Sequence, residues 1–102
     1  MNQEKIIALL ILDNRDEFSN SYQLCKILAW KFKIISCDNL IKNLCDEKLI
    51  DAQYTNGLGK FTLTTKGKNA ITQHWKETTD YYTAVFPDEA IFINKLKLNY
   101  TN

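Results

Sequence analysis

Proline, glycine, histidine and arginine are all scarce in this sequence. Its 102 residues include one Pro, three Gly and one His, and Arg15 is the only arginine. So few turn-forming residues argue against long loops, linkers and low-complexity segments. The longest apolar run, residues 6–12, is far shorter than the ~20 residues that span a bilayer, and no small-residue cleavage site follows it. We therefore expect a cytoplasmic protein that makes no contact with a membrane.

Cysteine is limited to Cys25, Cys37 and Cys45. A zinc site needs about four ligands, and His74 is the only histidine that can add to these three. If Cys37 and Cys45 lie on one helix, they stand about 12 Å apart, which is too far for a disulfide. The sequence therefore predicts three small buried thiols, no metal and no cofactor.

The sequence contains no recognisable catalytic constellation. No Ser or Cys stands near His74 in the sequence as the partner of a nucleophilic pair. Gly57-x-Gly59 falls within a predicted hairpin and not between a strand and a helix, so it is not a phosphate-binding loop. We expect a protein without catalytic residues, and not an enzyme.

Charge is balanced overall but unevenly distributed. The formal net charge is +1. Residues 36–54 hold two Lys and four acidic residues, a local charge of −2, whereas residues 55–79 hold four Lys and one Glu, a local charge of +3. A protein that touches phosphate needs only a local basic surface, because salt screens charges beyond about 8 Å.

Hydrophobic periodicity and capping residues predict five helices, at about residues 3–13, 21–32, 36–48, 65–82 and 87–99. The first is apolar nearly all round, so we expect it to be buried on two faces. The third, which Ser36 can cap, has an apolar side and a polar side. Residues 96–100 also alternate, so a strand remains an alternative between residues 90 and 100.

Residues 49–55 and 60–64 alternate like strands, and Asn56 to Gly59 supplies a turn between them. In the second strand, Phe61 and Leu63 should cover the third helix while Thr62 faces outward. Thr64 or Thr65 can cap the next helix. A bulky side chain at position 67, in the first turn of that helix, would clash with the sheet. The sequence thus predicts a mostly helical α+β domain over residues 1–76, with an aromatic helical extension over residues 77–102 that packs on it or forms a dimer.

Two motifs make the pattern more specific. Leu40-Ile41-x-x-Leu44-x-x-x-x-Leu49-Ile50 leads into Phe61-Thr62-Leu63-Thr64-Thr65-Lys66-Gly67. Together they resemble the signature that ends the third helix and closes the wing in MarR-like and PadR-like bacterial regulators, where Tyr is frequent at the position of Phe61. The resemblance covers roughly residues 4–76.

This resemblance implies a winged helix-turn-helix: three helices, a two- to three-stranded wing, and one or two C-terminal helices. It further implies a small transcriptional regulator that reads double-stranded DNA with helix 36–48 and wing 54–64. A homodimer through the C-terminal and first helices is also implied. The residues expected to contact DNA are Lys31, Lys33, Ser36, Asn39, Lys42, Asn43, Asn56, Lys60, Thr62, Lys66 and Lys68.

The alternative is a winged-helix protein-interaction module that does not bind DNA. Asp38 and Asp46 place negative charge on the third helix, which has no Arg, the commonest base-reading residue. A positive surface that joins the lysines without interruption would favour DNA, and one interrupted by Asp38 and Asp46 would favour protein contact. The lysines concerned are Lys31, Lys33, Lys42, Lys60 and Lys66.

Overall fold

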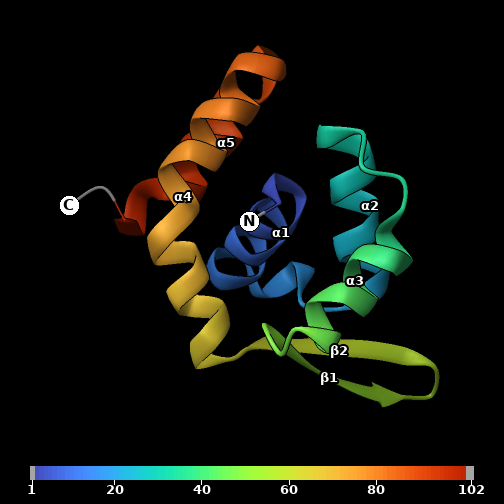
Figure 1. The fold of residues 1–102 in the computed structure, drawn as a ribbon. Coiled ribbons are helices and arrows are strands. Elements are labelled where there is room, and N and C mark those ends of the chain that lie inside the picture. Colours follow the sequence, from blue (N-terminus) through green and yellow to red (C-terminus); the bar gives the residue numbers. More distant parts are fainter. Residues whose placement is uncertain (1, 101–102) are drawn as a thin grey trace.

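The computed structural model describes residues 2–100, so the outermost residues of the predicted ranges 1–76 and 77–102 lie outside it. Its elements are α1 (Gln3–Asn14), α2 (Ser21–Phe32), α3 (Cys37–Asp46), β1 (Ile50–Thr55), β2 (Leu58–Leu63), α4 (Thr65–Val85) and α5 (Ala90–Lys97) (Figure 1). Short 3-10 turns lie at Asp16–Phe18, Pro87–Glu89 and Leu98–Tyr100. The predicted mostly helical α+β class is confirmed.

Helix α1 lies at the centre of the fold, surrounded by α2, α4, α5 and the hairpin (Figure 1). Every residue from Ile6 to Leu12 is buried. A helix that is apolar on all sides can bury all of its side chains only when other elements surround it. The prediction that this helix is buried on more than one face is confirmed.

Helices α2 and α3 differ in how their first turns are capped but are followed by the same backbone conformation. Asn20 caps α2, because its side chain accepts a hydrogen bond of 2.8 Å from the amide of Gln23. Ser36 precedes α3 as predicted, but its hydroxyl makes no capping bond. Lys33 and Lys48, which follow α2 and α3, adopt left-handed backbone conformations with φ of 59° and 60°. These positions reverse the chain direction after each helix.

The hairpin pairs β1 with β2 in antiparallel register, from Ile50 opposite Leu63 to Thr55 opposite Leu58. Only Asn56 and Gly57 form its turn, with φ of 55° and 81°, the pair of positive angles that a two-residue hairpin turn requires. The predicted turn was therefore too long: Gly59 lies within β2, buried beneath the ring of Tyr54. A bulkier residue than glycine would collide with that ring.

The second strand follows the predicted alternation, since Phe61 is buried, Leu63 is half-buried and Thr62 is exposed. It does not cover the third helix as predicted, because β2 packs mainly on α2 and α1, and β1 is the strand that contacts α3. The outer edge of β2 is tied to the segment before α2, because the amide of Phe61 donates to the carbonyl of Ser19 over 2.7 Å. This bond accompanies an isolated bridge between Asn20 and Lys60. The free edge of the sheet is therefore that of β1.

The junction between β2 and α4 also matches its prediction. Thr64 caps α4 by accepting a 3.0 Å hydrogen bond from the amide of Gly67. Gly67 is buried against the residue before β1, and a Cβ there would overlap the backbone carbonyl of Leu49. Glycine at this position lets α4 start directly against the first strand.

The C-terminal part packs on the rest of the chain. Helix α4 continues through residue 76, where the predicted domain boundary fell, as far as Val85. The ring of Phe32 in α2 lies 5.0 Å from that of Tyr82, 5.9 Å from Phe86 and 6.1 Å from Phe92. Residues 90–100 are helical, which excludes a strand there; the regular α-helix starts at Ala90, because Pro87–Glu89 forms a 3-10 turn.

The prediction of three buried thiols is wrong. Cys25 and Cys37 form a disulfide, with their Cα atoms 5.5 Å apart, and Cys45 is a half-buried free thiol. The bond is possible because α2 and α3 cross where these two residues face each other, a tertiary contact that spacing along a single helix does not reveal. The bond joins α2 to the first residue of α3.

Candidate interaction surface on α3 and the hairpin

The polar side of α3 is exposed, as the sequence predicted. Its side chains are Asp38, Asn39, Lys42, Asn43 and Asp46, and all five are exposed. The ammonium of Lys42 lies 3.1 Å from a carboxylate oxygen of Asp46, one helical turn away. With two carboxylates and one ammonium, this side has a net formal charge of −1.

Of the other predicted DNA contacts, Ser36 lies exposed at the start of α3 and Lys33 just before it. Lys31 points elsewhere: it forms an ion pair of 3.1 Å with Glu89 and lies over the rings of Trp30 and Phe92. The structure therefore separates Lys31 from the α3 side.

The remaining predicted contacts lie on the hairpin and the start of α4. Asn56 is in the exposed turn. Lys60, Thr62 and Lys68 line a hollow of about 530 Å³ that also includes Asp13 and Asp16. Lys66 donates a 2.9 Å hydrogen bond to the carbonyl of Glu47. Lys60, Thr62 and Lys68 thus share a hollow with two carboxylates, whereas Asn56 lies in the turn and Lys66 lies beside the end of α3.

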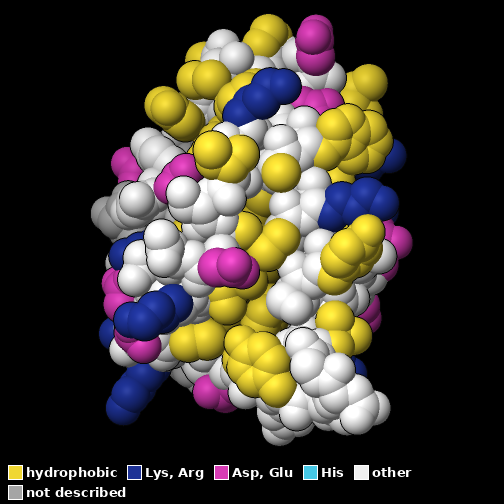
Figure 2. Space-filling model, turned by 90° about the vertical axis from the view of Figure 1, so that its right-hand side faces the viewer, with side chains coloured by type: hydrophobic (Ala, Val, Ile, Leu, Met, Phe, Trp, Pro, Cys, Tyr) yellow, Lys and Arg dark blue, Asp and Glu magenta, His cyan; other side chains and the backbone are white. Residues whose placement is uncertain are grey.

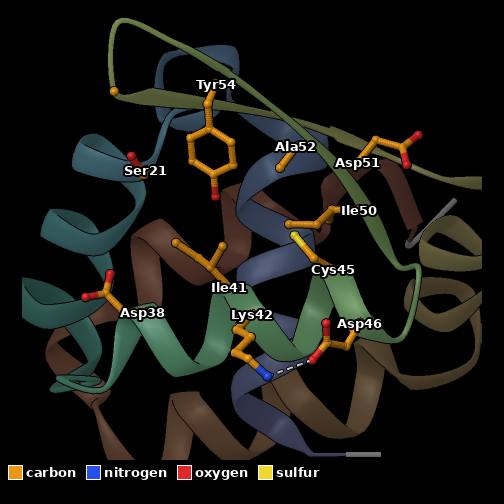
Figure 3. Close-up of a pocket in the computed structure, with 11 residues that line it drawn as sticks. Ser21, Asp38, Ile41, Lys42, Cys45, Asp46, Ile50, Asp51, Ala52 and Tyr54 are labelled. Carbon is orange, nitrogen blue, oxygen red and sulfur yellow. Dashed lines mark hydrogen bonds and ion pairs between the residues drawn. The ribbon is translucent and has the colours of Figure 1, made fainter.

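A groove of about 710 Å³ lies between α3 and β1, and we call it the α3–β1 groove. Figure 3 shows the ring of Tyr54 reaching from the hairpin toward Ile41 on α3. Its apolar lining consists of Ile41, Cys45, Ile50, Ala52 and Tyr54. Its acidic rim consists of Asp38, Asp46 and Asp51, all exposed, and the one cationic residue of the rim, Lys42, is paired with Asp46.

The thiol of Cys45, in the lining of the groove, is a poor nucleophile. Burial raises its pKa, and the negative charges of Asp46 and Asp51 raise it further.

His74 lies on α4, where its ring nitrogen is 2.8 Å from Glu77, the residue one turn along the same helix. Across residues 2–100, no group of three or more His, Cys, Asp or Glu side chains is arranged to hold a metal ion, and no helix there is long and apolar enough to cross a membrane.

A second hollow, of about 670 Å³, adjoins the groove, and we call it the α2–turn hollow. Tyr22, Ile35 and Leu58 line it with 64%, 87% and 49% of their surfaces exposed. The disulfide residues also line it, and Ser21, Asp38 and Gly57 line both hollows. Figure 2, which faces this side of the molecule, shows apolar side chains exposed over much of it.

Sequence reasoning missed the α2–turn hollow. One signal was present: Ile34 and Ile35 are adjacent between two helices, and a short turn buries only one of two neighbouring side chains. Ile34 is buried and Ile35 is exposed. Leu58 was a weaker signal for the hollow, because the sequence placed it in the hairpin turn, whereas in the structure it is the first residue of β2.

No family model, curated protein or solved structure that was compared with the chain matches it.

Proposed function

We propose that this chain is a winged helix-turn-helix domain that works as a protein-interaction module. Three helices, a hairpin and a further helix follow one another in the order of that fold, and α3 has an exposed side next to the hairpin. In this proposal the α3–β1 groove and the α2–turn hollow together form the binding surface. The role is binding and not catalysis.

The charge distribution on this surface supports a protein partner over DNA. Of the five lysines that a positive surface would need, three are engaged within the chain: Lys31 with Glu89, Lys42 with Asp46, and Lys66 with the carbonyl of Glu47. The carboxylates of Asp38 and Asp46 stand at the two ends of α3, where they would face the phosphates of a bound duplex. DNA affinity depends mainly on neutralising phosphates, so this arrangement weakens it.

The apolar surface supports the same conclusion. Ile35 is 87% exposed, so it keeps nearly all of its apolar surface in water and contributes little hydrophobic stabilisation to the fold. Tyr22, Tyr54 and Leu58 add exposed apolar area on the same side of the molecule. Contiguous exposed apolar patches with polar margins are typical of protein–protein interfaces, and Tyr is enriched at such interfaces.

Matched substitutions test the proposal. Ile35→Ser removes apolar surface from the proposed interface, and Ile91→Ser does the same on α5, where the side chain is 74% exposed. Immobilised wild type and both variants are incubated with lysate of the source organism, and the retained proteins are quantified by mass spectrometry. We expect a partner that Ile35→Ser retains about tenfold less and Ile91→Ser retains normally. A partner set unaffected by Ile35→Ser contradicts the proposal.

The second candidate is DNA binding by a transcriptional regulator, and the order of elements favours it. Here α3 would enter the major groove, and Lys60 and Lys68 would contact phosphate from the hairpin side. A titration with mixed duplex DNA near 50 mM salt separates the two candidates. The DNA proposal is preferred if the protein binds the duplex and if Lys42→Ala and Lys60→Ala each lower the slope of log affinity against log salt concentration by the equivalent of about one phosphate contact.

A homodimer accompanies the DNA proposal, because a twofold dimer would present two α3 helices to successive major grooves. The predicted dimer used the first and C-terminal helices. Helix α1 is covered within the chain, so any such interface would depend on exposed residues of α4 and α5, such as Tyr81, Val85 and Ile91. Light scattering after gel filtration measures the mass directly, against 11.9 kDa for the monomer.

A further inference from the structure

The α3–β1 groove combines an apolar lining with an acidic rim. Ile41 and Ile50 are buried at its base, whereas Tyr54 is 63% exposed and leaves part of its ring available to a ligand. Asp38 and Asp46 stand at opposite ends of α3, and Asp51 stands on β1 (Figure 3). The cation among them, Lys42, is already paired with Asp46. Two of the three carboxylates therefore have no ion pair within residues 2–100.

The strand beside the groove also has a free edge. Within residues 2–100, β1 pairs with β2 and with no other strand. The opposite edge of the hairpin is covered, because β2 is bonded to Ser19 and bridged to Asn20. An exposed edge of this kind presents backbone donors and acceptors at the spacing of a strand, and extended peptides of partner proteins bind such edges.

We propose that the α3–β1 groove binds an extended, cationic amphipathic segment of a partner protein. The segment adds to the free edge of β1 as a third strand. Its apolar side chains enter the groove toward Ile41 and Tyr54, and its Lys or Arg side chains reach the acidic rim. The inference rests on the proposed function and adds to it the chemistry of the partner.

Local charge, and not the charge of the whole molecule, is the source of this preference. The chain has a net charge of +1, so its overall field does not attract a cationic peptide. The three rim carboxylates attract a cationic peptide only at close range, because salt screens their charge beyond about 8 Å. This difference allows a control in which the same number of charges is removed elsewhere.

The test is a selection from a randomised peptide library of about 12 residues, displayed on phage, against the immobilised full chain. Selected peptides are then synthesised and their affinities measured by fluorescence anisotropy. The probe variant is Asp38→Asn with Asp46→Asn and Asp51→Asn. The control variant, Asp16→Asn with Asp80→Asn and Asp88→Asn, changes the net charge equally at exposed positions outside the groove.

We expect the selected peptides to be rich in Lys or Arg, with apolar residues at alternate positions. The probe variant should bind them about tenfold more weakly than wild type, because it loses three exposed ion pairs that each add a small part of the affinity. The control variant should bind within about twofold of wild type, because its substitutions lie outside the groove. Affinity should also fall as salt rises from about 50 mM to about 300 mM.

Two other outcomes are distinguishable. Selected peptides that lack cationic residues, or that bind the probe and control variants equally, overturn the cationic inference and leave the proposed protein-binding function standing. If no peptide is enriched over a Tyr54→Ser variant, in which an exposed side chain of the groove loses apolar surface without gaining charge, the groove does not bind peptides, and this inference falls. In that case the Ile35→Ser comparison still decides the proposed function.

Discussion

Gly67→Ala should destabilise this protein although alanine is a better helix former than glycine. Gly67 lies in the first turn of α4, buried against the chain that leads into β1. A Cβ there would stand 3.1 Å from Leu63 Cδ2 and 3.2 Å from the carbonyl carbon of Leu49, with the carbonyl oxygen nearer still. The nearest atom is the backbone oxygen of Leu49, so it cannot rotate away as a side-chain atom would.

The expected magnitude is the difference between two opposing effects. Replacing glycine in a helix gains at most about 1 kcal/mol. Relieving the overlap requires α4 to move away from the Leu49 carbonyl, and overpacking of this kind costs about 1–3 kcal/mol. The same movement weakens the 3.2 Å hydrogen bond from the Thr64 amide to that carbonyl, which adds about 1 kcal/mol. We expect a net loss of about 2 kcal/mol, or a Tm lower by roughly 8–16 °C.

Thermal unfolding followed by circular dichroism measures this loss. Asn69→Ala is the matched control, because Asn69 lies two residues further along α4 with an exposed side chain. Alanine is the better helix former there, so the control should be neutral or raise the Tm slightly. A Tm for Gly67→Ala at or above that of wild type would refute the steric argument and the placement of α4 against the Leu49 carbonyl.

Two further predictions concern the disulfide and the buried Tyr82. Cys25→Ser with Cys37→Ser should lower the free energy of unfolding, measured in urea, by about 3 kcal/mol, which is the loop-closure estimate for cysteines 12 residues apart. Cys45→Ser, the control, should change it by less than about 1 kcal/mol. Equal effects of the double and the single change would contradict the disulfide. Burial raises the pKa of Tyr82 above its ordinary value of about 10, so the neutral phenol is favoured in the folded state. The associated stability is complete below pH 10 and is lost as the pH rises further. Tm measured between about pH 9 and pH 11 should therefore fall less steeply in Tyr82→Phe than in wild type, and parallel curves would exclude this role of Tyr82.

Much of the fold could be predicted because its signals are local. The helix periods, the Thr64 cap and the alternation of Phe61 with Thr62 each depend on residues within a few positions of one another. Gly67 was also recognisable, because a glycine in the first turn after a strand indicates close packing. These features were confirmed by the structure.

The candidate site was less predictable because its properties depend on contacts between distant residues. Lys31 pairs with Glu89, 58 residues away in sequence, and this ion pair removes it from the expected basic surface. The partner of Cys37 is on another helix, so spacing along α3 alone could not identify it. The exposure of Ile35 depends on which of two adjacent isoleucines turns inward, and that is decided by the packing of α2 against α3.

The central position of α1 also affects how the protein is made. Its apolar run has no charged residue between Ile6 and Leu12, and α4 covers α1 more extensively than any other element does. The end of α4 lies 71 residues after the end of α1, from Asn14 to Val85, which corresponds to about 4–14 s of synthesis at 5–20 residues per second. During that interval the run is an apolar, uncharged segment exposed on the nascent chain, and segments of high hydrophobicity and low charge are prone to aggregate. Chains cut short before α4 should therefore accumulate as insoluble protein or remain bound to chaperones.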